Sequence, residues 1–338
     1  MNPRVTAALE RTRLLVGPAL EAAVNRLSPR IRRPGRYHFG WADQRGETVP
    51  GGGHGKGVRP TLALLSAEAV GAPPEVGLPG AVAVELVHNF SLVHDDIIDD
   101  DPERRHRATV WKVFGTGDAI VVGDALMLLA MEVLLDESTP ERTSAAAELV
   151  RATADMIAGQ YLDMTFDRSG SVDVEQCWEM VSLKTGALLT YACGVGAMLA
   201  GAPTDTVRLL GRFGDHLGRA FQAVDDLLGI WGDPAVTGKP VGNDLRNRKR
   251  SIPVIVALHS GTPAGDRLEK LYAQDRLDDA DLARAADLVE EAGGREACLF
   301  AAREDMDKAA EALSQAGIEA RVEEELMDLA EFVVNRQY

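Results

Sequence analysis

Apolar residues recur along nearly the whole chain at the three- and four-residue spacing that places them on one face of a helix. The strict alternation of apolar and polar residues that marks a half-buried strand is nearly absent. Clusters of proline and glycine, such as those at 27–35 and 70–77, interrupt the pattern. The pattern predicts helices over about 3–27, 59–71, 79–100, 117–135, 139–167, 173–184, 186–201, 204–231, 252–260, 278–292, 295–315 and 318–336.

Neither a repeat of solenoid length nor a change in composition divides the chain, so we expect a single all-α domain over residues 1–338. The stretch 28–57 has the least regular pattern and is long for a loop inside a compact domain. We therefore predict that 28–57 is an irregular loop that acts as a lid, is an ornament, or is partly mobile.

One predicted helix is apolar on every side, which is typical of a buried helix, and it ends in acidic residues. The stretch VHDDIIDDDPERR places five aspartates within seven positions. At 100° per residue His88, Asp95 and Asp99 fall along one stripe of the helix, with Asp96 beside it. Buried like charges repel and are costly to desolvate, so the cluster indicates bound cations. The alternative is a solvated helix end in an acidic protein.

A second apolar helix carries the stretch FQAVDDLLGIWGD, in which Gln222, Asp225, Asp226 and Gly229 share one face. Two helices with inward-facing aspartate pairs are expected to form opposite walls of a metal site. Carboxylate oxygens without Cys or His ligands favour Mg²⁺, which completes its shell with water and substrate phosphate. An ordinary acidic helix end explains either pair alone, but the two pairs together favour a metal site.

Basic and polar residues in four stretches are candidates to bind phosphate. Arg104 and Arg105 directly follow the first acidic stretch, and Lys239 and Lys249 follow the second. GKGVRP supplies Lys56 and Arg59, and SLKTGAL supplies Lys184 and Thr185. Arginine matches phosphate with two parallel hydrogen bonds, whereas lysine acts as a point charge. A surface base near acids is the ordinary interpretation of each one, and it is retained for Arg107, Arg246, Arg248 and Arg250.

Bulk composition narrows the classes of partner. The formal net charge of −16 argues against nucleic acid and against general binding to anionic membranes. No uninterrupted apolar run reaches transmembrane length, so stable membrane insertion is not expected. The three cysteines lack metal-ligand spacing and the N-terminus lacks a signal sequence, which predicts reduced thiols and a cytoplasmic protein.

From about residue 52 to the C-terminus the chain resembles the trans-isoprenyl diphosphate synthases of the polyprenyl synthetase family. The resemblance rests on seven stretches in order: GKGVRP, ELVHNFSLVHDDIIDDDPERRHRATVW, GDAL, AGQYLD, LKTGAL, FQAVDDLLGIWGD and GKPVGNDLRNRKRSIPV. It implies an all-α, isoprenoid-synthase-type bundle of about ten or more helices around a central cavity, and a homodimer.

The resemblance also assigns roles to the candidate residues. It implies that the diphosphate of isopentenyl diphosphate is held by Lys56, Arg59, His88 and Arg105. It implies that the allylic diphosphate is contacted, directly or through metal, by Arg104, Lys184, Thr185, Gln222 and Lys239; Lys249 joins the substrate-binding candidates. The implied ligands of Mg²⁺, as three ions bridging to the allylic diphosphate, are Asp95, Asp99 and Asp225, supported by Asp96 and Asp226. The residues expected to act in catalysis are Asp95, Asp99, Asp225, Lys184 and Arg104.

The implied reaction explains why the aspartates are needed. Cleavage of the allylic C–O bond leaves an allylic cation and a diphosphate, whose charge Mg²⁺ and basic residues stabilise. The alkene of isopentenyl diphosphate attacks the cation, and proton loss gives a product five carbons longer. The released diphosphate can accept that proton.

Three departures from the family pattern remain. The family usually has a basic residue where Gly57 stands and often an aspartate where Gly229 stands, and residues 28–52 match no part of it. Gly229 keeps open the closest alternative, a class I terpene cyclase on the same scaffold, which needs no isopentenyl site. The His94–Asp95 pair suggests a metal phosphohydrolase, but that leaves the second aspartate pair unused. A non-catalytic partner subunit would be free to lose its aspartates.

Phe90 and Ser91 are the candidates that limit product length. They precede Asp95 by five and four residues, which places them about 6–8 Å lower along the helix. A large ring beside a small residue would close the end of a tunnel for the growing chain. An ordinary hydrophobic core residue is the alternative interpretation of Phe90. By resemblance, a lone aromatic at this position suggests a short-chain synthase with a C20 product favoured and C15 next. Met127 or Leu128 is the alternative floor.

Overall fold

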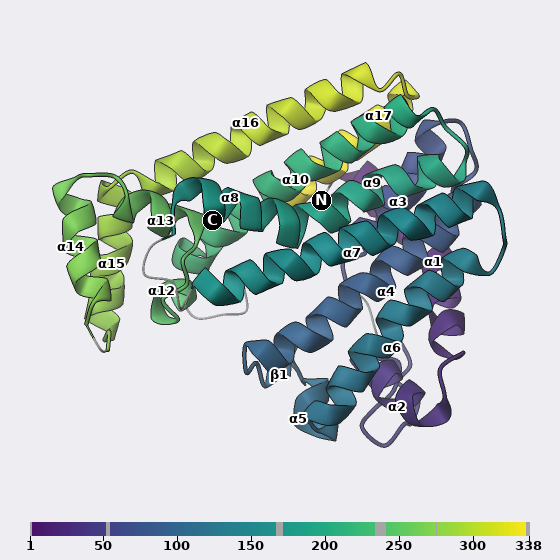
Figure 1. The fold of residues 1–338 in the computed structure, drawn as a ribbon, viewed down its shortest axis with the longest axis horizontal. Helices are drawn as coiled ribbons and strands as arrows, with labels where there is room; N and C mark the ends of the chain where they lie inside the picture. Colours follow the sequence, from purple (N-terminus) through teal and green to yellow (C-terminus); the bar gives the residue numbers. More distant parts are fainter. Residues whose placement is uncertain (1, 52–54, 167–171, 234–240, 275, 336–338) are drawn as a thin grey trace. The chain divides into compact units, whose positions relative to one another are not determined.

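A computed structural model describes residues 2–51, 55–166, 172–233, 241–274 and 276–335 (Figure 1). The described chain is almost entirely helical, which confirms the predicted all-α class. Its short antiparallel hairpin pairs β1 (Glu103–Arg104) with β2 (Arg107–Ala108).

The helices of the first half are α1 (Pro3–Val24), α2 (Pro29–His38), α3 (Val58–Ala69), α4 (Pro74–Ile98), α5 (Val110–Phe114), α6 (Thr116–Leu135) and α7 (Pro140–Phe166). Those of the second half are α8 (Val174–Val181), the π-helix η1 (Ser182–Gly186), α9 (Ala187–Leu199), α10 (Thr204–Trp231), α12 (Asn243–Arg246), α13 (Ile252–Leu258), α14 (Pro263–Tyr272), α15 (Asp279–Glu291), α16 (Gly294–Gln315) and α17 (Ala320–Val334).

Every predicted helix is present, with ends that differ by a few residues. The prediction missed α2, α5, α12 and α14. Helix α2 lies inside 28–57, so the prediction of an irregular loop is wrong for residues 29–38. Its sequence, PRIRRPGRYH, has too few apolar residues for a helical period, but Pro29 suits the first helical turn because proline fixes φ near the helical value.

The chain divides into two compact units. Unit 1 comprises Met1–Thr153, Tyr191–Gly211 and Ala316–Asp328, and unit 2 comprises Ala154–Thr190, Arg212–Gln315 and Leu329–Tyr338. Four of the five unit boundaries fall inside helices α7, α9, α10 and α17, and the fifth follows the end of α16. The expectation of a single domain stays a prediction.

Helix α4 forms the centre of unit 1, where it packs against α3, α6 and α1 (Figure 1). It is apolar because it is surrounded: Ala81, Val84, Leu86 and Val87 are fully buried. By length and composition alone α4 is long and apolar enough to cross a membrane, which was not expected from the sequence. Since 61% of its apolar window is buried within the protein, α4 is a core helix.

In unit 2, helix α13 packs against α8, α14, α15 and α16. Its residues Val254 and Ala257 join Ile230 at the end of α10 and Leu245 of α12 in one apolar core. This core fixes the end of the second acidic helix and the segment that follows it.

Close backbone contact in unit 1 depends on Gly196 of α9. Its N–H donates to Ser66 Oγ at 2.8 Å. A methyl group on Gly196 would lie 2.1 Å from the carbonyl oxygen of Ala63. A side chain at residue 196 would therefore force α9 away from α3.

We predict that Gly196→Ala lowers the free energy of unfolding by about 1–3 kcal/mol, because the added methyl overpacks the contact. Chemical denaturation measures this change. Gly117→Ala is the matched control: Gly117 is helical, and nothing lies within 4 Å of an added methyl. This control should be neutral or raise stability by up to about 1 kcal/mol. Equal effects of the two changes would contradict the packing argument.

Candidate functional site

The carboxylates at the acidic end of α4 differ in how deeply they are buried. Asp96 is 1% exposed, and it accepts a hydrogen bond from Arg104 Nε at 2.6 Å. Burial raises the pKa of Asp96, and the neighbouring Arg104 opposes that rise. Asp95 is half-buried, and Asp99, which caps the helix, is exposed. The stripe predicted from the sequence thus places Asp95 and Asp99 on the accessible side, while Asp96 holds an arginine.

The hairpin that follows α4 presents the two neighbouring arginines. Its turn consists of Arg105 and His106, with φ of 52° and 60°. A two-residue turn of this kind normally uses Asn and Gly, so the presence of arginine and histidine at these positions indicates a functional constraint. Arg105 reaches Gly55, whose added methyl would lie 3.0 Å from Arg105 Nη2.

Arg107 anchors this hairpin to the segment after α2. Its guanidinium donates to the carbonyl oxygens of Tyr37 and Ala42 at 3.1 Å each, and it lies 4.4 Å from the centre of the Tyr37 ring. Tyr37 in turn donates its hydroxyl to the Ala108 carbonyl at 2.8 Å. The interpretation of Arg107 as an ordinary surface base is therefore wrong. Nothing in the sequence pairs it with Tyr37, because the two lie 70 residues apart.

Lys56, Arg59 and His88 all belong to unit 1. Arg59 Nη1 lies 3.5 Å from His88 Nε2. Burial, reinforced by Arg59 and the hairpin arginines, lowers the pKa of His88 well below its usual value. The imidazole is consequently neutral at neutral pH, and it adds no charge to the arginines around it.

A hydrogen-bond network lies behind Arg105 and joins α2 to α4. His38 Nε2 lies 2.9 Å from Asn89 Oδ1. The Asn89 amide donates to the backbone carbonyl and to the carboxylate of Glu85 at 2.8 and 3.0 Å. Burial lowers the pKa of His38 to about 3, so this ring is also neutral.

Phe90 and Ser91 lie one to two turns before the acidic end. The Phe90 ring is 6% exposed and meets the His94 ring edge-on at 5.1 Å. His94 Nε2 lies 3.1 Å from the carbonyl oxygen of Ile120 in α6. Ser91 Oγ donates to the His88 carbonyl at 2.8 Å. Of the alternative floor residues, Met127 is half-buried and Leu128 is 66% exposed.

In unit 2, Lys184 and Thr185 lie on the π-helix η1, a form that recurs at functional sites. Lys184 Nζ lies 2.5 Å from Asp163 Oδ2. Thr185 Oγ1 donates to Gln222 Oε1, and Gln222 Nε2 donates to Asp226 Oδ1, both at 2.9 Å. The π-helix is thus joined directly to the second acidic helix.

A second link between α10 and η1 was not predicted from the sequence. Arg219 donates to Ser182 Oγ at 3.2 Å and to Asp305 Oδ2 at 3.3 Å, and its guanidinium lies 4.7 Å from the Trp178 ring. His216 Nδ1 lies 2.9 Å from the other Asp305 oxygen. Asp305 is 3% exposed. The helical spacing of 219, 222 and 226 was the available signal, but Asp305 is too distant in sequence to be inferred.

The second aspartate pair repeats the division seen in α4. Asp226 is 3% exposed and accepts from the Ile252 N–H at 2.9 Å, whereas Asp225 is exposed. Lys249 Nζ lies 3.7 Å from Asp226. Burial alone would lower the pKa of Lys249, but the surrounding carboxylates, Asp226 foremost, raise it overall. The remaining candidate, Lys239, lies outside the described residues.

Gly229 makes room for a carboxylate from another segment. A methyl on Gly229 would lie 2.2 Å from Asp244 Oδ2, so the Asp244 carboxyl occupies the space beside this position. Lys249 Nζ lies 3.8 Å from the same Asp244 oxygen. Where Gly229 replaces the aspartate that is frequent in the family, Asp244 of α12 therefore places its carboxylate beside the same position.

Both acidic sets fit a hard divalent cation. Among the described residues, no three His, Cys, Asp or Glu side chains are grouped closely enough to hold a metal ion. The accessible donors, Asp95, Asp99 and Asp225, are carboxylates. Such oxygen donors suit a cation that binds one or two carboxylates and takes its other ligands from water and phosphate.

Comparisons with known proteins all indicate the same family. Residues 50–289 match the family model of polyprenyl synthetases. A farnesyl diphosphate synthase of Mycobacterium tuberculosis is 44% identical, covering 100% of this chain and 95% of its own. A geranylgeranyl diphosphate synthase of the same organism is 42% identical, covering 92% of this chain and 89% of its own.

Solved structures agree with this assignment. A polyprenyl synthetase from Streptomyces coelicolor has a TM-score of 0.93 and 50% identity, covering 98% of this chain and 99% of its own. A polyprenyl synthase from Caulobacter crescentus, complexed with calcium and isoprenyl diphosphate, has a TM-score of 0.84 and 26% identity, covering 99% and 98%. The bound calcium agrees with use of a divalent metal in this group of proteins.

The contact between Gly229 and Asp244 can be tested through stability. We predict that Gly229→Ala costs about 1–3 kcal/mol of unfolding free energy, because the methyl displaces the Asp244 carboxyl. In the background of Asp244→Ala the same change should cost at least about 0.5 kcal/mol less. Denaturation of the four proteins of this double-mutant cycle measures the difference. Strict additivity would contradict the contact.

Proposed function

The chain belongs to the polyprenyl synthetase family, and on that premise we propose that it condenses isopentenyl diphosphate with an allylic diphosphate to form a short-chain isoprenyl diphosphate. The supporting observation is the acidic end of α4, where Asp95 and Asp99 stay accessible while Asp96 fixes Arg104 beside them. The relatives include both C15 and C20 synthases. We favour C20, with C15 next.

We propose Mg²⁺ as the divalent cation, in three ions, with Asp95, Asp99 and Asp225 as its main ligands and Asp96 and Asp226 in support. When bound, Mg²⁺ would stabilise the charge that develops on the departing diphosphate. The aspartates serve as ligands in this scheme and need not exchange protons with substrate.

Basic residues of the chain would bind the two substrates separately. Lys56, Arg59, His88 and Arg105 would hold the diphosphate of isopentenyl diphosphate. Neutral His88 can donate a hydrogen bond there without adding to the repulsion between the arginines.

A second basic group would bind the allylic diphosphate. Its members would be Arg104, Lys184, Lys239 and Lys249, aided by Thr185 and Gln222. Because Asp96 already orients Arg104 and Asp163 already orients Lys184, little reorganisation would accompany the reaction. The departing diphosphate would receive the proton lost from the product.

Arg219 would act through the π-helix as a positioning residue. It holds Ser182 at one end of η1, while Gln222 holds Thr185 near the other. Asp305 fixes the guanidinium from behind. These contacts support the proposal that α10 sets the position from which Lys184 and Thr185 meet the substrate.

We also propose a cytoplasmic homodimer. Helix α6 exposes Ile120, Val121, Leu128 and Leu135, an apolar set of the kind that a partner subunit covers. The cysteines Cys177, Cys193 and Cys298 are free and buried, which suits a reducing compartment.

A product assay tests the proposed function. The enzyme receives Mg²⁺, isopentenyl diphosphate and dimethylallyl, geranyl or farnesyl diphosphate in turn, and the products are separated by chain length. Asp95→Ala and Asp225→Ala should each lower kcat by about 10²-fold or more, because each removes charge stabilisation of the leaving group. The matched control is Asp118→Ala, an exposed acid of α6.

Two results would contradict the proposal. One is ordinary turnover by Asp95→Ala or Asp225→Ala at the same Mg²⁺ concentration. The other is hydrocarbon formed from geranylgeranyl diphosphate without isopentenyl diphosphate, which would favour the class I terpene cyclase.

Chain length gives a further prediction. Phe90→Ala should shift the main product upward by at least one C5 unit, because it removes the ring proposed to floor the tunnel beside Ser91. Product analysis measures the shift, with Phe300→Ala, an exposed aromatic of α16, as control. An unchanged product from active Phe90→Ala enzyme would show that another residue limits the chain, with half-buried Met127 as the next candidate.

A further inference from the structure

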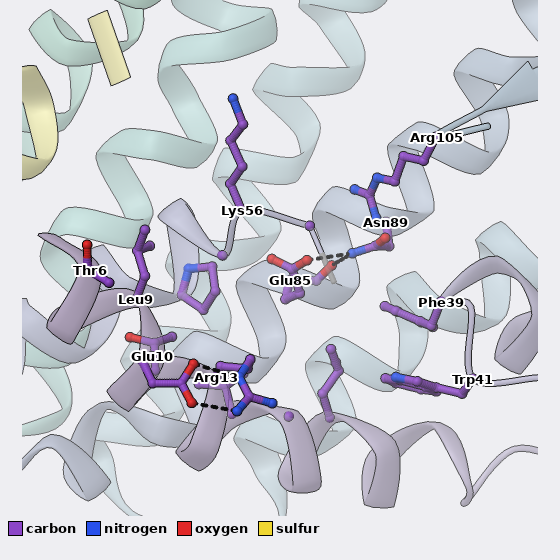
Figure 2. A pocket seen from close by; sticks show the side chains of 17 residues that line it. Thr6, Leu9, Glu10, Arg13, Phe39, Trp41, Lys56, Glu85, Asn89 and Arg105 are labelled. Atoms are coloured by element: carbon purple, nitrogen blue, oxygen red, sulfur yellow. Dashed lines mark hydrogen bonds and ion pairs between the residues drawn. The ribbon is translucent and has the colours of Figure 1, made fainter. Parts of the chain in front are cut away.

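Arg105 is the residue of the β1–β2 hairpin that lines a cavity of about 470 Å³ within unit 1 (Figure 2). Figure 2 shows its side chain directed toward Asn89. Phe39 and Trp41, from the segment after α2, line the same cavity, whereas Arg107 does not. Where the Arg105 guanidinium lies therefore depends on what holds the hairpin backbone.

The backbone at the tip of the hairpin is strained. Arg105 and His106 have φ of 52° and 60°, in the left-handed region that favours glycine. Residues with side chains keep such a conformation only where the surrounding structure holds them there. The turn alone does not explain the position of Arg105, so its support has to come from contacts outside the turn.

The first strand of the hairpin is held by the acidic end of α4. Arg104 Nε donates to Asp96 Oδ1 at 2.6 Å. Thr109 closes the base of the hairpin: its N–H donates to the Pro102 carbonyl and its hydroxyl to the Asp101 carbonyl, both at 3.0 Å. Arg104 is thus fixed through its own side chain, independently of the second strand.

The second strand is held by the end of α2 and the chain after it. The Arg107 guanidinium donates to the carbonyl oxygens of Tyr37 and Ala42, and the Tyr37 hydroxyl donates back to the Ala108 carbonyl at 2.8 Å. Tyr37 is 7% exposed and Ala42 is 1% exposed. Arg107 therefore ties the strand that follows the turn to buried residues of unit 1.

Direct contact with an anion is the alternative role for Arg107. It lines a second cavity of about 200 Å³ together with Arg104 and Arg105. However, Arg107 Nη1 and Nη2 each donate to a backbone carbonyl, and the guanidinium lies 4.4 Å from the centre of the Tyr37 ring. Three contacts with one segment orient the planar group, which favours an anchoring role.

We propose that Arg107 and Tyr37 are positioning residues for Arg105. They hold the strained turn so that Arg105 meets the diphosphate of isopentenyl diphosphate, while Arg104 keeps its position through Asp96. This inference rests on the proposed function, and it names two residues that set the affinity for one substrate without touching it. Loss of either contact releases the turn and moves the Arg105 guanidinium from its place in the cavity.

Steady-state kinetics with each substrate varied in turn provide the first test. Arg107→Gln and Tyr37→Leu should each raise the KM for isopentenyl diphosphate about tenfold, because Arg105 loses its charged hydrogen bonds to that substrate. The KM for the allylic diphosphate and kcat should each change less than about threefold. Tyr37→Leu keeps the charge of Arg107, so a matching effect of the two variants separates positioning from loss of charge.

Two further variants calibrate these effects. Tyr37→Phe keeps the ring beside Arg107 and loses only the hydroxyl, so it should raise the KM for isopentenyl diphosphate less than Tyr37→Leu does. Lys112→Gln is the matched control, because Lys112 is an exposed cation that lies 5.2 Å from the centre of the Trp111 ring. Its KM values should equal those of wild type.

A double variant tests whether Arg107 acts through Arg105. In the background of Arg105→Gln, adding Arg107→Gln should lower kcat/KM for isopentenyl diphosphate by less than about threefold, because no guanidinium is left to position. If the two changes instead multiply, so that Arg107→Gln has its full tenfold effect without Arg105, then Arg107 acts on the substrate independently and the proposal is overturned.

Hydrogen exchange measured by mass spectrometry tests the hairpin without turnover. The amides of residues 103–109 should exchange about tenfold faster in Arg107→Gln and Tyr37→Leu than in wild type, because the second strand has lost its anchor. The control Lys112→Gln should exchange at the rate of wild type. Circular dichroism and chemical denaturation check that every full-length variant is folded.

These measurements separate failure of this inference from failure of the proposed function. Unchanged exchange in Arg107→Gln and Tyr37→Leu overturns the inference whether or not a primer is elongated. Faster exchange with an unchanged KM for isopentenyl diphosphate, or with an equal rise in both KM values, overturns the assignment to Arg105 and leaves the synthase intact. If no primer is elongated, the proposed function fails, and exchange alone decides whether the two residues hold the hairpin.

Discussion

Each acidic helix must satisfy a buried carboxylate before its neighbours can meet a substrate. Asp96 is held by Arg104, and Asp226 by the Ile252 N–H, Gln222 and Lys249. A buried charge without such partners would cost several kcal/mol, so these contacts constrain the segments that supply them. The buried aspartate thereby fixes the basic residue or loop beside the helix, and the more accessible aspartate is the one proposed to bind a cation.

This constraint explains why the candidate site residues were easier to predict from the sequence than the residues that hold them in place. Helical spacing placed Asp95 and Asp99 on one stripe and Asp225 on one face with Asp226, because each aspartate pair and its apolar helix are local in sequence. The choice of Asp95, Asp99 and Asp225 as the main ligands came from the family resemblance. Arg107, Arg219 and Asp305 were missed since their partners lie far along the chain. Longer helices were predictable from apolar period; α2 was not, because its turns carry mostly arginine, proline and glycine.

Gly229 illustrates how a departure from a family pattern depends on tertiary contact. From the sequence alone, glycine at position 229 indicates that a carboxylate of the family pattern has been lost. In the structure, Asp244 enters the space beside it, and Lys249 lies near both Asp244 and Asp226. The local density of negative charge is thus retained by a residue 15 positions later, and only the fold of the α12 segment brings it there. A single-position comparison cannot detect such an exchange.

Residues 28–51 support residues of the candidate site through contacts with distant parts of the sequence. Helix α2 and the chain after it supply Tyr37 and Ala42 to Arg107, His38 to Asn89, and Phe39 and Trp41 to the cavity beside Arg105. One segment therefore supports the arginine hairpin and lines the space that hairpin faces. A ligand held against Phe39 and Trp41 would meet the same structural unit that positions Arg105. The binding of substrate would then depend on a support that the catalytic motifs alone do not reveal.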